Sequence, residues 1–508
     1  MHSFALETTG KLNNMSDKPQ QVTAEAPSRT TSDLVKAAVS GWLGTALEFM
    51  DFQLYSLAAA LVFKDLFFPE GHPTMAILGA MAIYGVGYIA RPLGAWYFGR
   101  MGDRVGRTKV LFITIAMMGV ATTLIGFLPT YSQVGILAPT LLVILRLVQG
   151  FGAGAEIAGA AVMLAEYAPS NQRGIISSLV ALGTNSGTLG AGLIWAIMLG
   201  TMGSDTVIAW GWRIPFIASA VLMGLAVFIR LHLKETPVFE ATQEGIILSD
   251  EELVSEYDKP LAPRAERKAE LKEQQAADHK AIEEQLQKTP KSIKAFLAAS
   301  VLRFGQSGNS GIMQTYIITF LTAEVLLAKS VASNIVVYSS IVGFLTVPVI
   351  GWIGDRIGRE RTYRLITGIG ILLIIPCFLG LVSPQFLGTE TVMEKGVAHY
   401  SAPTLIFFIS YIVLHNITVL AMFSLENITM AECFGSAHRY EQLALSKEIP
   451  NMITAGFGPL IAAALVAHFN SWIPLAIMMF VYTVAVHITA WMMPEITGRD
   501  LSVREDAF

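Results

Sequence analysis

A hexapeptide that occurs twice constrains this chain more than any other feature of its sequence. Gly-Asp-Arg-Val-Gly-Arg at residues 102–107 returns as Gly-Asp-Arg-Ile-Gly-Arg at residues 354–359, and each copy lies between two long apolar stretches. An internal repeat fixes the architecture that every other motif must fit. The sequence therefore predicts two related halves, each with the same charged loop between hydrophobic segments.

The composition indicates that most of the chain lies in a lipid bilayer. Hydrophobic residues make up 53% and charged residues only 15%, whereas about a quarter of a soluble chain is charged. A large soluble bundle would show polar stripes along most of its helices, and most segments lack them. A spanning helix needs about 20 apolar residues. Twelve segments meet this requirement: 38–63, 76–99, 109–129, 137–164, 175–200, 208–230, 295–322, 331–353, 363–383, 402–430, 442–467 and 472–493.

A second repeated pair supports the duplication and defines the domains. Glu166 and Arg173 lie seven positions apart after segment four, as do Glu432 and Arg439 after segment ten. Two parallel halves with a substrate path between them are typical of transporters. We therefore expect an all-α polytopic membrane protein with twelve transmembrane helices in two six-helix pseudo-repeats. Its predicted parts are a disordered tail at 1–36, a bundle at 37–232, a linker at 233–294, a bundle at 295–494 and a tail at 495–508.

The linker and the basic residues predict how the chain is placed. Residues 264–288 are rich in Ala, Glu, Lys and Gln, which favours a solvated helix, either as a hydrated linker or as a regulatory or partner-binding element.

Short loops near cytoplasmic membrane surfaces carry an excess of Lys and Arg. One set of loops carries Arg100, Arg104, Arg107, Lys109, Arg173, Arg356, Arg359, Arg361, Arg364 and Arg439; the other carries Lys64, Arg213, Lys329 and Lys395. This difference predicts a multi-pass protein of the cell (inner or plasma) membrane, with both termini and the linker in the cytoplasm.

Several motifs together resemble one transporter family. The pattern Gly-x-x-x-Asp-Arg-x-Gly-Arg, at 99–107 and 351–359, is that of the major facilitator superfamily. Within it, the chain resembles the metabolite:proton symporter family at 48–55, 91–99, 146–156 and 169–174. The resemblance implies the major facilitator fold and proton-coupled uptake of an organic acid such as a di- or tricarboxylate, 2-oxoglutarate or shikimate. The same family also contains importers of the zwitterionic osmolytes proline and betaine, so uptake of such an osmolyte is the alternative.

The first segment contains the predicted proton-binding residues. A charged side chain inside a membrane helix usually faces a partner or a wet cavity. Glu48 and Asp51 are three residues apart, so both carboxylates and Tyr55 share one helix face. We expect that face to line the cavity. Repulsion between the two carboxylates favours the binding of a proton by one of them.

Segment four supplies a matching polar stripe. Arg146, Gln149 and Glu156 fall on one side of a helix with 3.6 residues per turn. The resemblance implies that Arg146 faces Asp51 or Glu48, and that protonation of the acid frees the arginine for an anionic substrate. The alternative is a permanent structural ion pair. The predicted proton-coupling residues are Asp51, Glu48, Arg146 and Glu156.

The remaining candidate binding residues lie on segments two, seven and eleven. Arg303 begins a polar face on segment seven and either binds substrate or extends to the membrane surface. Lys447 and Asn451 share a face, with Glu448 beside Lys447 as a neutralising partner. We expect Arg91 of segment two to line the cavity or to belong to a gate. The predicted substrate-binding residues are Tyr55, Arg91, Arg146, Gln149, Arg303, Gln306, Ser310, Gln314, Lys447 and Asn451.

The repeated loops predict a cytoplasmic gate. Their glycines permit tight turns, and their charged residues pair with carboxylates or cap helix ends. Such contacts would hold the cytoplasmic side closed and break when the halves rock. The predicted gate residues are Gly99, Asp103, Arg104, Gly106, Arg107, Glu166, Arg173, Gly351, Asp355, Arg356, Gly358, Arg359, Glu432 and Arg439.

The motifs that the sequence lacks narrow the function further. It contains no Gly-rich phosphate loop ending in Gly-Lys-Ser or Gly-Lys-Thr, so we expect no ATP and no cofactor other than protons as the coupling ion. We also expect no metal site, no nucleic-acid partner, no enzyme activity and a monomer in the bilayer. The basic candidates favour a small carboxylate. Phe49, Phe52 and Tyr55 keep a quaternary ammonium cargo open, and a non-transporting membrane sensor is a further alternative.

Overall fold

The computed structural model describes residues 31–58, 62–63, 66–68, 73–202, 206–231, 280, 289–317, 320–321, 324–325, 327, 329–384, 391–394, 397–400 and 404–508. The predicted N-terminal tail up to residue 30 lies outside these residues. So does nearly all of the predicted linker, including its predicted helix at 264–288 apart from residue 280.

The first half contains six helical passes. Its elements are α1 (Thr31–Ala58), α3 (Pro73–Val105), α4 (Arg107–Ile125), α5 (Tyr131–Val134), α6 (Leu137–Ala153), α7 (Glu156–Tyr167), α8 (Arg173–Met202), the π-helical turn η2 (Val207–Gly211) and α10 (Arg213–Leu231). Helices α6 and α7 form one pass that is interrupted at Gly154 and Ala155. Short α5 connects α4 to α6.

The second half repeats the six passes but contains more irregular turns. Its elements are α13 (Ile293–Ser310), η3 (Gly311–Tyr316), α15 (Lys329–Ile357), α16 (Arg359–Leu381), β1 (Thr391–Glu394), β2 (Val397–Tyr400), α18 (Leu405–His415), η4 (Asn416–Ala421), α19 (Met422–Cys433), α20 (Arg439–Asn451), η5 (Met452–Gly456), α21 (Gly458–Phe469) and α22 (Ile473–Met492). The described residues thus form the expected twelve passes. The antiparallel hairpin of β1 and β2, in which Thr391 pairs with Tyr400, was not predicted.

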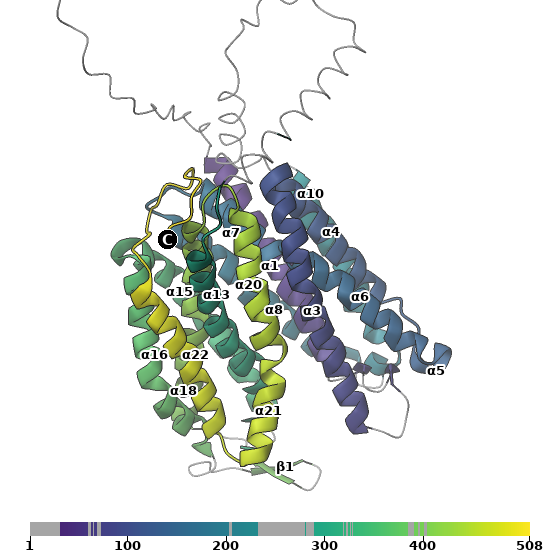
Figure 1. Ribbon diagram of the computed structural model, residues 1–508. Helices are drawn as coiled ribbons and strands as arrows, with labels where there is room; N and C mark the ends of the chain where they lie inside the picture. Colours follow the sequence, from purple (N-terminus) through teal and green to yellow (C-terminus); the bar gives the residue numbers. More distant parts are fainter. Residues whose placement is uncertain are drawn as a thin grey trace, which may run out of the picture.

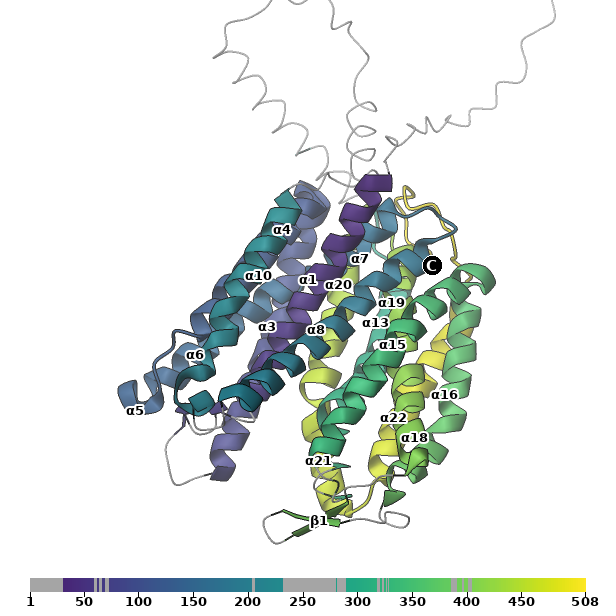
Figure 2. The same cartoon turned by 180° about the vertical axis from the view of Figure 1, so that it is seen from behind.

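The two halves form two bundles that stand side by side (Figures 1 and 2). We call the end that carries both hexapeptides the motif end. The start of α1 and the C-terminus also lie there, while the β hairpin lies at the opposite end (Figure 1). The bundles meet along two seams, where α3 packs along α20 and α8 packs along α15.

The distribution of side chains is that of a membrane protein. Seven of the described passes are long and apolar enough to cross a bilayer by length and composition alone. Large apolar side chains such as Leu93, Val221 and Leu372 are exposed on the outside of the bundles, whereas ionisable side chains such as Asp51 and Arg146 are buried inside. In lipid, only helices with internally satisfied backbones span the core, and charged groups turn toward the protein interior.

The repeated hexapeptide is a junction between two helices, which corrects the expectation of a loop. Residues 102–105 form the last turn of α3, and Arg107 already begins α4. Only Gly106 separates the two helices, with φ of 116°. Gly358 does the same between α15 and α16, with φ of 101°. A side chain is strained in this region of backbone conformation, so one glycine makes the turn without intervening residues.

Close backbone contact joins α3 to α6 inside the first bundle. A methyl group on Gly94 would overlap the carbonyl oxygen of Phe151, and one on Gly150 would overlap the carbonyl oxygen of Gly87. Small residues at such crossings let membrane helices approach through their backbones. This contact places Arg91 of α3 deep between the halves.

We predict that Gly94→Ala destabilises the protein by about 1–3 kcal/mol, because the added methyl group forces α3 away from α6. Gly224→Ala is the control, since a methyl group there meets no atom within 4 Å, and alanine favours the helix relative to glycine. Thermal unfolding in detergent should show a lower Tm for the first variant and an equal or higher Tm for the second. Equal Tm values for both variants would contradict the packing argument.

Candidate functional site

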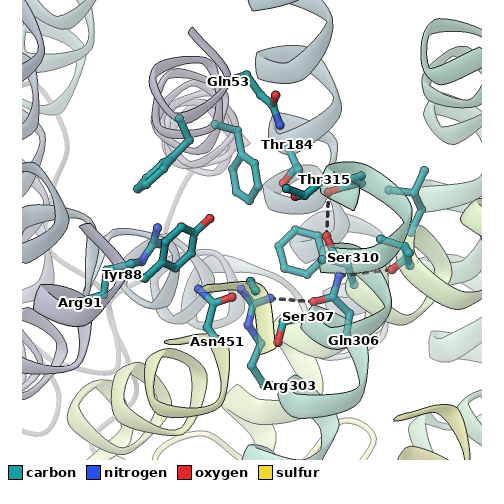
Figure 3. Close-up of a pocket in the computed structure, with 18 residues that line it drawn as sticks. Gln53, Tyr88, Arg91, Thr184, Arg303, Gln306, Ser307, Ser310, Thr315 and Asn451 are labelled. Carbon is teal, nitrogen blue, oxygen red and sulfur yellow. Dashed lines mark hydrogen bonds between the residues drawn. The ribbon is translucent and has the colours of Figure 1, made fainter. Parts of the chain in front are cut away.

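A narrow pocket lies between the two halves (Figure 3). Helices α1, α3 and α8 of the first half form one wall, and α13, α19, α20 and the three π-helical turns of the second half form the other. Among the described side chains that line it, the only charged ones are Arg91 and Arg303. The complete lining is Phe49, Phe52, Gln53, Tyr88, Arg91, Thr184, Arg303, Gln306, Ser307, Ser310, Gly311, Gln314, Thr315, Val419, Leu420, Phe423, Asn451 and Ala455.

The structure brings six of the ten predicted substrate-binding residues to the pocket and places four elsewhere. Those that line it are Arg91, Arg303, Gln306, Ser310, Gln314 and Asn451. Those that do not are Tyr55, Arg146, Gln149 and Lys447, all of them buried. The α13 face spaced at Arg303, Gln306, Ser307 and Ser310 lies on the pocket as its helical periodicity indicated.

Helix α1 faces the pocket with a different side from the one expected. Phe49, Phe52 and Gln53 line the pocket, whereas Glu48 and Asp51 contact the neighbouring helices α3 and α4. At about 100° per residue, the two sets are rotated by about a third of a turn. The acidic face of α1 therefore lies behind the aromatic face, inside the first bundle.

Arg91 joins the two halves through a buried ion-pair triad. Its Nη2 donates to Glu48 Oε1 at 2.5 Å, and its Nε donates to Glu448 Oε2 of α20 at 2.7 Å. All three side chains are buried. The guanidinium also lies 4.9 Å from the ring centroid of Phe52 and 5.4 Å from that of Tyr88. We call Glu48, Arg91 and Glu448 the acidic triad, because one cation lies between two carboxylates.

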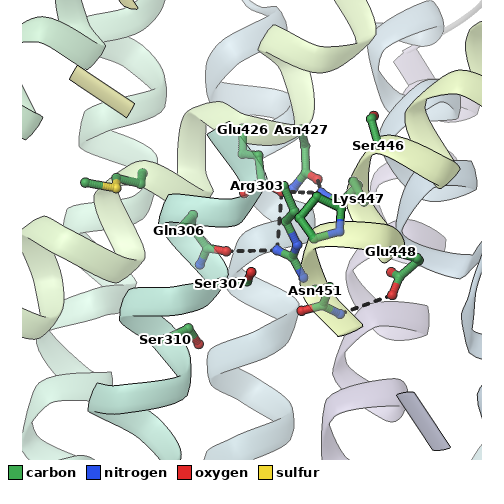
Figure 4. Close-up of polar contacts among 12 residues, drawn as sticks. Arg303, Gln306, Ser307, Ser310, Glu426, Asn427, Ser446, Lys447, Glu448 and Asn451 are labelled. Atoms are coloured by element: carbon green, nitrogen blue, oxygen red, sulfur yellow. Dashed lines mark hydrogen bonds and ion pairs between the residues drawn. The ribbon is translucent and has the colours of Figure 1, made fainter. Parts of the chain in front are cut away.

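A second buried triad lies within the second half (Figure 4). Glu426 Oε1 accepts from Lys447 Nζ at 2.6 Å and from Arg303 Nη1 at 3.3 Å. Lys447 also donates to Asn427 Oδ1 at 2.6 Å. The carboxylate that pairs with Lys447 is thus that of Glu426, which corrects the expected neutralisation by Glu448. We call Arg303, Glu426 and Lys447 the basic triad, because one carboxylate is shared by two cations.

A chain of hydrogen bonds connects Asp51 to Arg146. Thr122 Oγ1 donates to Asp51 Oδ2 at 2.7 Å, Gln149 Nε2 donates to Thr122 Oγ1 at 2.8 Å, and Arg146 Nη1 donates to Gln149 Oε1 at 2.5 Å. The guanidinium of Arg146 lies 4.0 Å from the ring centroid of Tyr55. Asp51 and Arg146 are thus connected by hydrogen bonds through the neutral side chains of Thr122 and Gln149, behind the pocket wall.

The predicted proton-coupling acids are all buried. Glu156 accepts from Thr114 Oγ1 at 2.8 Å, beside the interruption between α6 and α7. Asp51 Oδ1 and Glu48 Oε2 have no hydrogen-bond partner among the described residues. A buried carboxylate oxygen without a donor is destabilising when the group is ionised, so both groups are suited to taking up a proton.

Three π-helical turns, which the sequence analysis missed, shape the second wall. Gln314 and Thr315 belong to η3, Leu420 to η4 and Ala455 to η5, and all of them reach the pocket. π-Helical turns are rare and often occur at functional sites. Among the other missed residues, Thr184 shares a face of α8 with Ser177 and Thr188, at spacings of seven and four, so this periodicity could have indicated it. Gln53 falls outside the acidic face of α1, and periodicity gave no signal for it.

At the motif end, an aspartate of each half binds the N-terminus of a helix of the other half. Asp103 accepts the backbone N–H groups of Tyr440 at 3.1 Å and Glu441 at 2.9 Å, at the start of α20. In the other copy, Asp355 accepts those of Gly174 at 2.7 Å and Ile175 at 3.0 Å, at the start of α8. The first N–H groups of a helix lack partners within it and carry positive partial charge.

The repeated glutamate and arginine pairs form the second layer of this contact. Glu166 accepts from Arg107 of its own half at 3.2 Å and from Arg439 of the other half at 2.8 Å. The other copy is arranged alike, because Glu432 contacts Arg359 at 2.9 Å and Arg173 of the first half at 3.8 Å. The duplicated motifs therefore contact each other's halves reciprocally.

The other predicted gate residues have varied positions. Gly99 lies against the backbone of Glu441, and Gly351 lies against that of Gly174, so both allow the seams to close tightly. Gly106 and Gly358 make the helix junctions. Arg104 is half-buried, whereas Arg356 is exposed with its guanidinium 5.0 Å from the ring centroid of Trp352.

Tyr440, which the sequence analysis did not single out, breaks the symmetry of the seams. Its ring fills the space over Gly102 and Gly159, where an added methyl group would overlap it. Its hydroxyl donates to the carbonyl oxygen of Ala155 at 2.9 Å, at the interruption before α7. The corresponding residue in the first half is Gly174, directly after Arg173, so no ring is inserted at the matching position of the other seam.

The predicted tail at 495–508 is folded across the motif end. Asp506 accepts the backbone N–H groups of Ser292 at 2.7 Å and Gly435 at 2.9 Å. The carbonyl oxygen of Arg499 accepts from Arg173 of the first half at 2.6 Å. The tail therefore contacts both halves beside the motif.

Comparison with known proteins identifies the family. The family model described as sugar (and other) transporter matches residues 35–508. A putative transporter, YdfJ, of Escherichia coli strain K12 is 46% identical over 90% of this chain and 96% of its own length. The shikimate transporter of the same strain is 33% identical over 91% and 94%, and its proline/betaine transporter is 31% identical over 92% and 85%.

Solved structures share the fold at much lower identity. The proton:xylose symporter XylE bound to 6-bromo-6-deoxy-D-glucose superimposes with a TM-score of 0.68 at 15% identity, covering 94% of this chain and 99% of that one. These relatives are transporters and not enzymes. With its twelve passes in two related bundles and a polar pocket between them, the chain belongs to the sugar (and other) transporter family and is a multi-pass metabolite transporter of the major facilitator superfamily.

Proposed function

We propose that the protein is a proton-coupled symporter that takes up a small organic acid by alternating access. The observation that supports this function best is the charge of the pocket. Arg91 and Arg303 face it from opposite halves, and no described carboxylate lines it. Arginine binds a carboxylate through parallel charge-assisted hydrogen bonds. Two acids balance Arg91, but Arg303 and Lys447 share one carboxylate, so the excess positive charge on the second wall favours an anionic cargo.

The aromatic lining supports an acid over a quaternary ammonium cargo. Such a cation would need free ring faces around it. The guanidinium of Arg91 already lies against the rings of Phe52 and Tyr88. The ring centroid of Phe423 lies 5.5 Å from the guanidinium carbon of Arg303 and 5.3 Å from Nζ of Lys447. Three of the four rings that line the pocket therefore hold the protein's own cations, Phe49 being the fourth, so the osmolyte alternative is the weaker one.

Asp51 is the best candidate for the coupling proton. It is fully buried, one of its oxygens has no partner among the described residues, and its other oxygen bonds a neutral hydroxyl. Protonation removes a buried charge and supplies a donor, whereas deprotonation restores attraction toward Arg146 through Gln149. The proton site then lies behind the pocket wall and acts on the cargo indirectly, through the packing of Phe52.

The motif-end contacts are suited to a gate on the cytoplasmic side. Asp103, Asp355, Glu166 and Glu432 each bind across the halves, and nearer the pocket the Arg91–Glu448 pair does the same. For the pocket to open toward the cytoplasm, all of these contacts must break. The positive-inside rule supports placing this end in the cytoplasm.

A proton-flux assay tests the proposed function directly. Purified protein is reconstituted in vesicles that contain a pH-sensitive dye, and shikimate, gluconate, 2-oxoglutarate, citrate, betaine or proline is added outside at low pH. We expect at least one acid to increase proton entry above the level in protein-free vesicles. Entry with betaine or proline alone would establish the osmolyte alternative. Binding without proton entry would identify a sensor or a uniporter.

We predict that Asp51→Asn abolishes proton-driven accumulation of the transported acid and leaves counterflow exchange partly intact, because the amide cannot carry the proton. Uptake in vesicles with and without a pH gradient measures both activities. Glu360→Gln is the control, since it removes a carboxylate that pairs with Arg364 away from the pocket. Full accumulation by the Asp51 variant would remove this residue from the coupling role.

We predict that Asp103→Asn opens the motif end, because a neutral amide binds the α20 N-terminus more weakly than a carboxylate. Spin labels on cysteines at exposed Lys109 and Arg361 report the opening, in a chain whose buried Cys377 and Cys433 are replaced by alanine. The distance distribution should gain a longer component. Lys36→Ala, at an exposed residue near the start of α1, should leave it unchanged. Identical distributions in both variants would contradict the gating role.

A further inference from the structure

The two buried triads beside the pocket have opposite formal charge. The acidic triad holds Arg91 between Glu48 and Glu448, for a formal charge of −1. The basic triad holds Glu426 between Arg303 and Lys447, for a formal charge of +1. Each triad presents one arginine to the pocket. The two arginines that line it therefore differ in how fully their charge is balanced.

The positive charge of Arg91 is already balanced by two carboxylates and is not available to a cargo. Its Nη2 and Nε donate to two different carboxylates at 2.5 Å and 2.7 Å. A cargo carboxylate at Arg91 would have to displace Glu448 or Glu48 and leave that acid buried without a partner. Breaking a buried pair in this way is strongly destabilising. In the state described here, Arg91 is a link between the halves.

Arg303 belongs to the triad with excess positive charge, and its guanidinium can still donate a hydrogen bond to a cargo. Its only acid among the described ion pairs is Glu426, which lies closer to Lys447, at 2.6 Å, than to Arg303, at 3.3 Å. Nε of Arg303 has no hydrogen-bond partner among the described residues. The side chain is buried and lines the pocket (Figure 3). A carboxylate placed there would balance the basic triad.

The rest of the polar lining is neutral and suits hydroxyl groups. Ser310 Oγ donates to Gln314 Oε1 at 2.7 Å, and Gln314 Nε2 lies 3.1 Å from Nε2 of buried His415, so the amide is held in one orientation. Amides and hydroxyls both donate and accept, as do the hydroxyls of a polyol. The neutral polar side chains of the pocket are Gln53, Thr184, Gln306, Ser307, Ser310, Gln314, Thr315 and Asn451.

We infer that the cargo is a hydroxylated monocarboxylate whose single carboxylate binds Arg303 and whose hydroxyls bind the neutral polar lining. A second carboxylate would find Arg91 already occupied by two acids, and a buried charge without a partner is strongly disfavoured. This inference rests on the proposed transport of an organic acid. It narrows that class to acids with one carboxylate and excludes di- and tricarboxylates.

Two matched series of compounds test the inference by titration calorimetry of the full chain in detergent at one fixed pH. Glucitol, gluconate and glucarate share a six-carbon chain with zero, one and two carboxylates. Inositol, quinate and 4,5-dihydroxycyclohexane-1,2-dicarboxylate form the corresponding hydroxylated ring series. In at least one series, the monocarboxylate should bind at least tenfold more tightly than both of its relatives.

Each other outcome overturns the inference in a distinguishable way. A dicarboxylate that binds as tightly as its monocarboxylate relative removes the single-carboxylate assignment but leaves organic-acid transport intact. Binding of betaine or proline alone removes both the inference and the proposed function. Failure of gluconate and quinate alike to bind also overturns the inference.

Two variants assign the carboxylate to Arg303. Arg303→Gln should weaken monocarboxylate binding at least tenfold, while Arg361→Gln, at an exposed arginine of α16, should leave it unchanged. Glu448→Gln frees Arg91 from one of its acids, so the dicarboxylate of the responding series should bind at least tenfold more tightly than to the wild type. This gain cannot result from misfolding. Unchanged dicarboxylate binding by the Glu448 variant would contradict the assignment of Arg91 as an occupied cation.

Discussion

The reciprocal capture of helix N-termini is the interaction on which the rest of the structure depends. Asp103 binds the start of α20 and Asp355 binds the start of α8, so each half holds the end of a helix that belongs to the other. These contacts combine hydrogen bonds to otherwise unpaired N–H groups with a favourable interaction with the helix dipole. They set the position of α20 against α3, and hence of Glu448 against Arg91.

Below that contact, the duplicated halves have diverged in charge. The first half contributes buried acids from α1, and the second contributes Arg303 and Lys447, with Glu426 between them. Buried ions are stable only in compensated groups; the basic triad is compensated within the second half, whereas Arg91 and Glu448 compensate each other across the halves. The imbalance that remains, negative in one triad and positive in the other, faces the seam where a proton and an anion would have to bind.

The parts of this arrangement that depend on local pattern could be predicted from the sequence. The twelve apolar segments, the duplicated motif and the family follow from composition, repetition and motif spacing, and the helices and relatives confirm them. The polar face of α13 was equally visible. The rotation of α1, which places Phe52 rather than Asp51 at the pocket, depends on packing against α3 and α4. The Arg91–Glu448 pair joins residues far apart in sequence, and no periodicity announces such a contact.

The two seams are built differently, and this difference affects how they can separate. Along α8 and α15 the contact at Gly174 and Gly351 is backbone against backbone, and the side chain of Asn185 lies over Gly343 farther along the same seam. Along α3 and α20 the ring of Tyr440 is inserted over Gly102 and Gly159 and must be withdrawn before any sliding begins. The duplicated fold therefore does not imply a symmetric motion. Opening on the side of α3 and α20 therefore includes one step, the release of the Tyr440 ring, that has no counterpart at Gly174.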